Sequence, residues 1–208
     1  MSYIQGACPI VTKRNLARNI FEYTLANKEL AEQAFPGQFV QVRVQDFQLR
    51  RPISLADINV DRGQFKIIFE VRGAGTQQLS QSKEWDMLDI MGPLGKGFTL
   101  LPPNKKVILI GGGIGTPPLL PLSGYYGGNA TTIIGFRNAQ AVILDQEFVR
   151  KYNQTILCTD DGSMGKKGYV TEALKRELKN GEKPDMIYAC GPTPMLKIIT
   201  ELAKEYHI

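Results

Sequence analysis

The chain is poor in the residues that build disulfide frameworks, metal centres and acid–base active sites. Its 208 residues include three cysteines, Cys8, Cys158 and Cys190, and a single histidine, His207. An odd number of cysteines without CxxC spacing argues against a disulfide framework, a zinc site or an iron–sulfur cluster within this sequence. His207 lies next to the last residue, where chains fray, so no Ser–His or Cys–His pair can be argued from it.

Long apolar runs and blocks of like charge are missing as well. No uninterrupted apolar stretch is long enough to span a bilayer. The N-terminal sequence MSYIQGACPIVTKRN lacks the long apolar core of a signal peptide. The net charge of +5, from 25 Lys and Arg against 20 Asp and Glu, is small and spread along the chain, which disfavours a nucleic-acid-binding surface. These absences predict a soluble, reduced, cytoplasmic protein.

Glycine and proline are plentiful instead, at 21 and 12 residues, and in the first half of the chain they separate short strand-like runs. Residues 19–26, 37–44 and 63–73 are rich in β-branched and aromatic side chains and are bounded by Gly, Pro, Asn or Asp, which predicts strands. A short helix is expected after Thr76. Several short strands at this spacing predict a closed or partly closed antiparallel barrel.

The second half follows a different pattern, in which strands alternate with helices. Residues 99–106, TLLPPNKK, are a plausible linker, so we expect one domain over residues 1–101 and a second over 102–208. Alternating strands and helices predict a doubly wound parallel sheet that binds ligands at the carboxyl ends of its strands. The expected strands are 106–110, 130–136, 154–161 and 185–191, and the expected helices are 141–152, 169–180 and 193–206.

The first strand of this half runs into a glycine-rich turn, VILIGGGIGTPPLLPL, at residues 107–122. The dinucleotide fingerprint GxGxxG fails here in both registers, because Thr116 and Pro118 occupy the third glycine position. The next strand ends at Arg137 rather than at an acidic residue. A standard Rossmann site is therefore disfavoured.

A different nucleotide-binding arrangement fits this turn. The glycines leave room for a ligand, Thr116 is expected as the N-cap, and Pro117 as the first helical residue. Such a helix start suits a pyrophosphate. The segment CGPTPML, residues 190–196, repeats the pattern with Thr193 as cap and Pro194 in the first turn. The alternative, that the glycines only permit tight strand–helix turns, is weaker with two such motifs on one sheet edge.

With these motifs in place, the chain resembles the ferredoxin–NADP reductase family over nearly its whole length. In the first half, RRPIS (50–54), VRGAGTQQLS (71–80) and MGPLGKGF (91–98) carry the resemblance. Within that family the chain is similar to the branch of electron transfer subunits from two-subunit, NAD-dependent dihydroorotate dehydrogenases. The segments PGQFVQV, RRPISLADI, GAGT, GPLGKGF and TDDGSMGKKGYVT occur here in the order that is specific to this branch.

The resemblance implies an N-terminal FAD-binding barrel followed by an NAD-binding α/β domain. It implies that Arg51 pairs with the FAD pyrophosphate and that Ser54 hydrogen-bonds the isoalloxazine near N5. Gly75 and Thr76 would donate backbone and hydroxyl hydrogens to the phosphates. The alternative for Arg51 is an ordinary surface cation. The other FAD-binding candidates are Pro52, Ile53, Ile68, Phe69 and Glu70.

For the second domain the resemblance implies a site for NAD. The candidates for its pyrophosphate are Gly113, Gly115 and Thr116. Cys190, with Gly191 and Pro192, would lie beside the nicotinamide, where a small side chain lets the ring stack on the flavin. The alternative for Cys190 is a buried apolar cysteine. Ser54 and Cys190 are thus the candidate catalytic residues.

The choice of nucleotide has two opposed signals. Asp160 and Asp161 at a strand end would repel a 2′-phosphate and favour NADH, whereas Arg137 would attract one and favour NADPH. The resemblance points to NADH, so Asp160 is a candidate NAD-binding residue.

Two departures from the family pattern are visible. Ile53 stands where many members of the wider family place an aromatic residue that stacks on the flavin. The dihydroorotate branch normally continues into a segment with four cysteines that bind a [2Fe–2S] cluster, and no such ligands are present in this sequence. Truncation and a short natural variant whose flavin passes electrons directly are both open.

The expected function is electron transfer. NADH gives a hydride to FAD, and the reduced flavin passes electrons singly to a partner. By resemblance the partner is the FMN-containing catalytic subunit of dihydroorotate dehydrogenase in pyrimidine biosynthesis, in a heterotetramer with net flow from dihydroorotate to NAD. The alternatives are a flavoprotein subunit of another NAD(P)H-linked ferredoxin or sulfur reductase complex and a non-catalytic nucleotide-binding regulatory subunit. No metal, nucleic acid or membrane span is expected.

Overall fold

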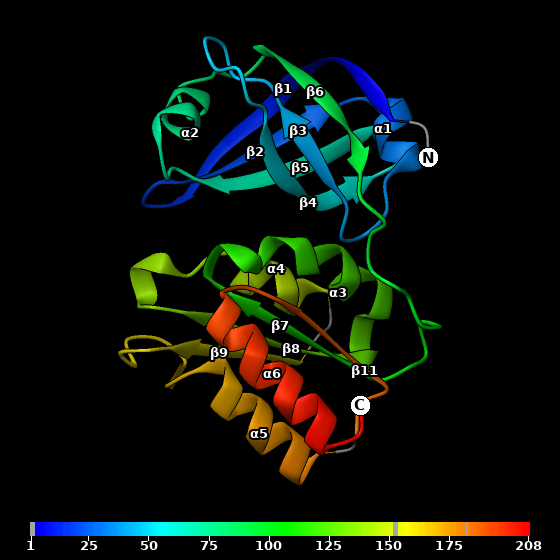
Figure 1. The fold of residues 1–208 in the computed structure, drawn as a ribbon, viewed down its shortest axis with the longest axis vertical. Helices are drawn as coiled ribbons and strands as arrows, with labels where there is room; N and C mark the ends of the chain where they lie inside the picture. The colour runs from blue at the N-terminus through cyan, green and yellow to red at the C-terminus, as the bar shows by residue number, and fades with distance from the viewer. Residues whose placement is uncertain (1–2, 152–153, 182) are drawn as a thin grey trace. The chain divides into compact units, whose positions relative to one another are not determined.

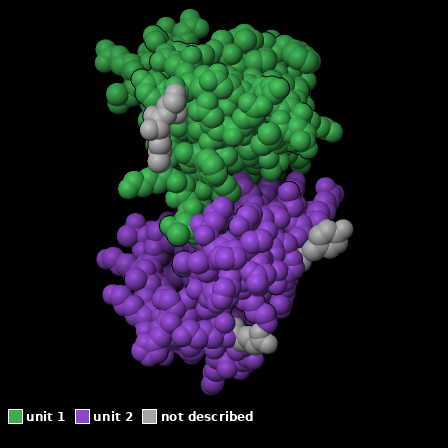
Figure 2. Space-filling view, turned by 90° about the vertical axis from the view of Figure 1, so that its right-hand side faces the viewer, with its two compact units in different colours: residues 1–99 green, residues 100–208 purple. Residues whose placement is uncertain are grey.

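The computed structural model describes residues 3–151, 154–181 and 183–208. The chain divides into two compact units, Met1–Thr99 and Leu100–Ile208, shown in green and purple in Figure 2. The first unit is a β-barrel and the second contains a parallel sheet.

The barrel is closed, and each of its strands is antiparallel to both neighbours. The expected antiparallel barrel is thus confirmed, and closure leaves its sheet without a free edge. Three of its strands lie outside the runs recognised from composition, because prolines and charged residues interrupt their alternation. In sheet order the strands are β1 (Ile4–Ala17), β2 (Ile20–Ala26), β5 (Gln64–Glu70), β4 (Arg51–Asn59), β3 (Phe39–Val42) and β6 (Met87–Leu94).

Alternation along the strands builds the barrel core. Tyr23 and Leu25 of β2 and Phe65 and Ile67 of β5 point inward and are at most 1% exposed. Burial of one such side chain contributes roughly 1.5–3 kcal/mol. The Tyr23 hydroxyl donates to the Leu79 carbonyl oxygen at 2.6 Å, so the largest polar side chain of this core is satisfied.

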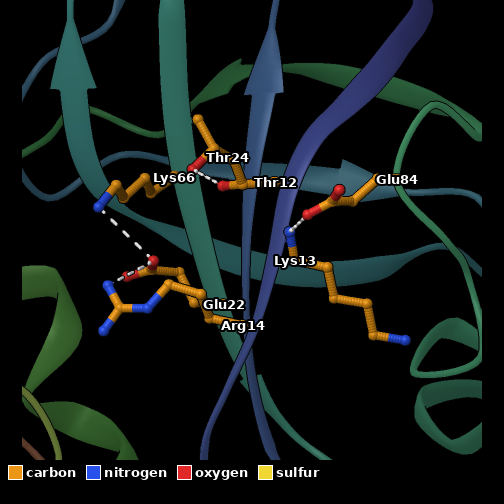
Figure 3. Close-up of polar contacts among 7 residues, drawn as sticks. All are labelled: Thr12, Lys13, Arg14, Glu22, Thr24, Lys66 and Glu84. Atoms are coloured by element: carbon orange, nitrogen blue, oxygen red, sulfur yellow. Dashed lines mark hydrogen bonds and ion pairs between the residues drawn. The ribbon is translucent and has the colours of Figure 1, made fainter.

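The outward face of β2 carries a buried carboxylate that fixes the strand register. Glu22 is 2% exposed and lies 3.2 Å from Arg14 Nη1 and 3.5 Å from Lys66 Nζ, as Figure 3 shows. Beside it the Thr12 hydroxyl donates to Thr24 Oγ1 at 2.8 Å. A slip of one residue would turn Glu22 into the apolar core, so only this register is compatible with both faces.

Two short helices complete the first unit. Helix α1 (Lys28–Gln33) was not expected from periodicity; the Asn27 side chain caps it by accepting from Leu30 N at 3.0 Å. Helix α2 (Ala74–Leu79) begins before Thr76 rather than after it. Its start is shifted because Thr76 Oγ1 accepts from the backbone N–H of Gly73, a capping interaction that places Thr76 inside the first turn.

The second unit is a doubly wound parallel sheet, as expected. Figure 1 shows α3 and α4 on one face of the sheet and α5 and α6 on the other. The strand order reverses between β7 and β11, and open α/β sheets bind ligands at such a reversal. In sheet order the strands are β10 (Lys166–Lys167), β9 (Gln154–Thr159), β8 (Ala130–Phe136), β7 (Val107–Gly112) and β11 (Met186–Cys190). The helices are α3 (Leu120–Tyr126), α4 (Asp145–Arg150), α5 (Val170–Asn180) and α6 (Thr193–Glu205), with 3-10 turns η1 (Gly113–Gly115), η2 (Pro117–Leu119), η3 (Gly127–Asn129) and η4 (Ala139–Ala141).

One expected helix is wrong in extent. Residues 141–152 were expected to be helical throughout, but α4 covers only Asp145–Arg150, and residue 152 lies outside the described residues. The Asn138 side chain caps a single 3-10 turn by accepting from Ala141 N, and Leu144 then adopts a left-handed conformation with φ 63°. The apolar residues before α4 are buried in a loop, so burial rather than helical periodicity explains their composition.

The proline-rich segment at residues 99–106 forms no strand or helix and is held to the second unit by side chains. The Leu101 N–H donates to the Tyr126 hydroxyl at 2.9 Å, and the hydroxyls of Tyr126 and Tyr188 are 2.7 Å apart. Lys105 Nζ lies 3.0 Å from a carboxylate oxygen of Asp185. The segment therefore packs as part of the second unit.

Candidate functional site

Strands β4 and β5 separate at one end of the barrel. Residues 51–54 of β4 pair with β3, and β4 pairs with β5 only from Leu55, which is opposite Ile67. Residues 68–70 of β5 continue beyond that point and pair with β2. The two segments that contain the FAD-binding candidates are therefore not paired with each other, and each leaves main-chain polar groups on the side where the strands diverge.

The side chains of these candidates are used in different ways. Ile53 and Phe69 belong to the barrel core, so only their main chains are available to a ligand. Ile68 is also buried, Pro52 is exposed, and Ser54 is partly exposed. In the described part of the chain, the Ser54 hydroxyl makes no hydrogen bond. The Glu70 carboxylate is occupied, since its Oε2 lies 2.7 Å from Arg72 Nε.

Arg51 and the start of α2 converge beside this opening. The Arg51 Nη1 donates to the Leu49 carbonyl at 2.9 Å, and its Cζ lies 5.1 Å from the centre of the Phe47 ring. A Cβ atom added to Gly75 would lie 2.5 Å from Arg51 Nε and Nη2. The guanidinium thus packs against the first turn of α2, and a planar guanidinium with free N–H groups is a donor that suits a phosphate.

Thr76 has a different role from the one expected for its hydroxyl. Its Oγ1 accepts from Arg72 N at 2.9 Å and from Gly73 N at 3.2 Å, and it donates to the Gly73 carbonyl at 3.0 Å. The hydroxyl hydrogen is therefore occupied within the turn and shapes the start of α2, while its backbone N–H remains in the first turn.

The other end of α2 is held by residues that the sequence did not indicate. Lys13 Nζ donates to the carbonyls of Ser80 and Ser82 at 2.7 and 2.8 Å, and the Lys13 backbone N–H donates to Glu84 (Figure 3). Ser80 is the C-cap of α2 and Ser82 lies beyond it, so Lys13 fixes the turn by which the chain leaves the helix. Lys13 and Ser80 are 67 residues apart, so no local pattern could have paired them.

In the second unit, the glycine-rich end of β7 lies against the end of β11. Cys190 is opposite Gly111 in the parallel register. A Cβ atom at Gly115 would overlap the Cys190 carbonyl and lie 2.7 Å from the Gly191 Cα. Gly113 differs, because it has a φ of 53° and nothing within 4 Å of an added Cβ. Gly115 therefore brings two strand ends together, whereas Gly113 faces open space that a ligand can approach.

The expected helix starts at these strand ends are confirmed in part. Thr116 stands at the N-cap position of η2 and Pro117 is the first residue of that turn, as expected, but Thr116 has helical dihedral angles and makes no side-chain cap bond. Its N–H donates to the Gly113 carbonyl, so helical turns begin at Gly113, and η2 precedes α3. Thr193 was also expected as a cap. Helix α6 instead starts at Thr193, with Pro192 at the N-cap, because the Pro192 carbonyl accepts from Leu196 N.

Two polar groups at the glycine-rich ends have notable environments. Thr116 is fully buried, and its hydroxyl has no hydrogen-bond partner among the residues that the structure describes; it lies 2.7 Å from an added Gly111 Cβ. Burial raises the pKa of the Cys190 thiol above its ordinary value, so Cys190 is uncharged at neutral pH. An uncharged, small side chain can pack beside an aromatic ring but supplies no thiolate nucleophile.

The ends of β8 and β9 place Arg137 and Asp160 next to each other. The N–H of Asp160 donates to the Phe136 carbonyl at 3.0 Å, and both Arg137 and Asp160 are exposed. Asp161 is used internally: its Oδ1 accepts from the Ser163 hydroxyl at 2.6 Å and from the Ser163 N–H at 2.9 Å. These bonds lower the pKa of Asp161. Of these two aspartates, Asp160 has the carboxylate that makes no hydrogen bond to the described residues.

Two classes of feature are absent from the described ranges. Among residues 3–151, 154–181 and 183–208, no three His, Cys, Asp or Glu side chains are grouped so that they could hold a metal ion. No helix in those ranges has the length and apolarity needed to cross a membrane.

Comparison with known proteins places these sites in a family. Residues 109–201 match the profile of the oxidoreductase NAD-binding domain family. The chain is 40% identical over 200 residues to the dihydroorotate dehydrogenase B (NAD(+)) electron transfer subunit of Geobacillus thermodenitrificans, covering 92% of this chain and 76% of that protein. It is 41% identical over 197 residues to the same subunit of Streptococcus mutans, covering 91% and 74%.

A solved structure shows the same architecture. A chain of the NADH-dependent reduced ferredoxin-NADP oxidoreductase, studied for flavin-based electron bifurcation, superposes with a TM-score of 0.85 at 32% identity. The match covers 96% of this chain and 72% of that one. Both the barrel and the parallel sheet thus have counterparts in a flavin-dependent oxidoreductase.

Proposed function

The chain belongs to the family of electron transfer subunits of dihydroorotate dehydrogenase B (NAD(+)), and we propose that it is an FAD-containing subunit that passes electrons between NAD(H) and a partner enzyme. The proposal rests on two nucleotide cradles that we infer on one chain. One is formed by Arg51 and the start of α2, and the other by the glycine-rich ends of β7 and β11. FAD, when bound, supplies the chemistry of accepting a hydride and releasing electrons singly.

In this proposal the first unit binds and orients FAD. The Arg51 fork and the N–H groups of Gly75 and Thr76 bind the pyrophosphate. The main chains of residues 51–54 and 68–70 bind the isoalloxazine, and the unpaired Ser54 hydroxyl donates near its N5. The aliphatic Ile53, whose side chain lies in the barrel core, fixes the strand rather than stacking on the ring.

The second unit binds NAD(H) at the reversal of its strand order. The pyrophosphate approaches the backbone closely near Gly113, since no heavy atom lies within 4 Å of a Cβ added there. The neutral Cys190 thiol, with Gly191 and Pro192, gives the nicotinamide a small and uncharged neighbour. Thr116 holds the end of β7 in place through its packing against Gly111.

The partner in this proposal is the FMN-containing catalytic subunit that oxidises dihydroorotate in pyrimidine biosynthesis. The relatives are named as electron transfer subunits of that enzyme, and an electron transfer subunit exchanges its electrons with a partner protein. We place the chain in a heterotetramer with this subunit, with net electron flow from dihydroorotate to NAD.

We expect the purified protein to carry flavin absorbance that NADH bleaches in the absence of oxygen. The measurement is the visible spectrum, followed by an anaerobic titration with just enough NADH to bleach the flavin. Addition of a small amount of the dihydroorotate-oxidising subunit together with orotate, which takes up the electrons to form dihydroorotate, should then restore the flavin bands. The physical reason is that both nucleotide cradles lie on this chain, so the first transfer needs no other protein.

Each outcome of this experiment separates the alternatives. A protein that binds no FAD contradicts the flavoprotein assignment. If the protein binds FAD but NADH does not reduce it, the chain is a nucleotide-binding regulatory subunit. Reduction by NADH with reoxidation by ferredoxin, but not by the dihydroorotate-oxidising subunit, would assign the chain to another reductase complex.

A second prediction concerns the choice between NADH and NADPH. We expect Asp160→Ala to raise kcat/KM for NADPH relative to NADH by about 10-fold, because a carboxylate near the 2′ position repels a phosphate and accepts a ribose hydroxyl. The measurement is flavin reduction at varied concentrations of each nucleotide. The exposed Arg137 lies at the neighbouring strand end, so Arg137→Ala should shift the ratio in the opposite direction. If the ratio of kcat/KM for NADPH to that for NADH is the same in Asp160→Ala as in the unmodified protein, Asp160 is not part of the nucleotide site.

A further inference from the structure

The Arg51 side chain is held in one direction although few protein atoms bind it. Its Nη1 donates to the Leu49 carbonyl at 2.9 Å. Within the described residues, no acceptor binds Nε or Nη2, which face Gly75. A single hydrogen bond does not fix a guanidinium at the end of a long side chain, because several rotatable bonds remain free. A second support is therefore required.

The Phe47 ring supplies that support. It lies 5.1 Å from the Arg51 Cζ, within the range of a cation–π contact. The ring is itself fixed, since Phe47 packs against the barrel core. A turn brings it there: the Phe47 N–H donates to the Val44 carbonyl at 3.2 Å, and Asp46 has a φ of 64°. The position of the guanidinium is thus fixed relative to the core of the barrel and not relative to a free loop.

The direction imposed on Arg51 has a chemical consequence. Its two unbonded donors lie against Gly75, at the start of α2. An added Cβ at Gly75 would lie 2.5 Å from both nitrogens, so no phosphate fits between the two groups. A phosphate that binds here lies beside this contact, at the guanidinium N–H groups that no acceptor among the described residues takes. Without the ring, the guanidinium is free to turn away from this position.

We propose that Phe47 is a positioning residue that aims the Arg51 guanidinium at the phosphates of the flavin nucleotide. This inference rests on the proposed function, because it needs FAD at the Arg51 cradle. Phe47 acts through Arg51 and touches no reacting atom. A cation–π contact of this kind changes a binding constant by about 3- to 30-fold, and this is the expected loss of FAD affinity when the ring is removed.

The test is a titration of the apoprotein with FAD, in which flavin fluorescence reports the binding. We expect Phe47→Leu to raise the Kd by about 3- to 30-fold and Phe47→Tyr to leave it within about 2-fold, because tyrosine keeps the aromatic face. Phe35→Leu is the matched control, since Phe35 is 60% exposed and makes no contact with Arg51 in the described structure. In an Arg51→Met background, Phe47→Leu should have no further effect, because the ring then has no cation to orient.

A second readout does not depend on flavin. In the 15N-labelled apoprotein, the Nε–H resonance of Arg51 should be shifted by the ring current of Phe47, and Phe47→Leu should abolish that shift while Phe47→Tyr retains it. An unmodified protein that binds no FAD would overturn the proposed function, and the positioning role with it. If the unmodified protein binds FAD, either of two results would overturn the positioning role alone. One is a Kd for FAD that Phe47→Leu leaves unchanged. The other is a loss of FAD affinity on Phe47→Leu that is equally large in the Arg51→Met background.

Discussion

Replacement of Arg51 by methionine is expected to give a folded protein that purifies without flavin. The side chain keeps its apolar stem but loses the fork that faces Gly75 and the start of α2. A hydrogen bond to a charged group contributes about 1.5–3 kcal/mol, so loss of two to the pyrophosphate should raise the Kd for FAD by about 100-fold or more. The measurements are the flavin absorbance of the purified protein and titration of the apoprotein with FAD.

Two variants control for charge and for folding. Arg51→Lys keeps the charge without the planar fork and should bind FAD with intermediate affinity. Arg62→Met removes an exposed arginine in the turn between β4 and β5 and should bind as the unmodified protein does. Full flavin content in Arg51→Met, with an unchanged Kd, would show that the cradle at α2 is not the phosphate site.

Gly115→Ala is expected to abolish reduction by NADH while leaving FAD bound. An added Cβ would overlap the Cys190 carbonyl and approach the Gly191 Cα to 2.7 Å. Both contacts are with backbone, which cannot move aside as a flexible side chain can, so the ends of β7 and β11 must separate. Overpacking of this kind costs about 1–3 kcal/mol in stability. We expect the rate of NADH-dependent flavin reduction to fall by about 100-fold, because small displacements in a reactive geometry have large effects on rate.

The matched control is another glycine in the same unit. Gly124 lies within α3, and its added Cβ would meet only the end of the Lys151 side chain, at 3.3 Å. Gly124→Ala should therefore stabilise the protein by about 0.5–1 kcal/mol through helix propensity and leave reduction unchanged. Thermal unfolding and stopped-flow reduction by NADH measure both variants. A Gly115→Ala protein with unchanged stability and rate would contradict the close packing of the two strand ends.

Much of the fold could be predicted because its signals are local. The run at residues 130–136 is one continuous buried strand in the structure, β8, since a parallel strand covered on both faces is apolar throughout. The apolar stripe of residues 169–180 is the amphipathic helix α5. Local signals failed where side-chain hydrogen bonds competed with periodicity. The Asn138 cap began a separate 3-10 turn before α4, and the Asn27 cap began α1 in a stretch without a helical pattern.

The candidate site was predictable only in part. The glycine-rich turns were identified from residue types, because glycine marks a close backbone approach, whereas the RRPIS segment was identified through the family resemblance. A glycine does not say what approaches it, however. At Gly115 it is the Cys190 backbone, whereas at Gly113 the space is open. The roles of Phe47 and Lys13 had no signal, since an aromatic residue and a lysine are ordinary in any sequence.

The sequence by itself determined the two-part architecture and the positions of most strands and helices in the second unit. These follow from periodicity, turn chemistry and residue type, which act over a few neighbouring residues. The tertiary structure alone decided which groups face one another: Phe47 and Gly75 around Arg51, Lys13 on the carbonyls that follow α2, and β7 against β11. Those contacts join residues far apart in the chain or depend on the geometry of a turn, and the free energy that selects them comes from the packing of the whole unit.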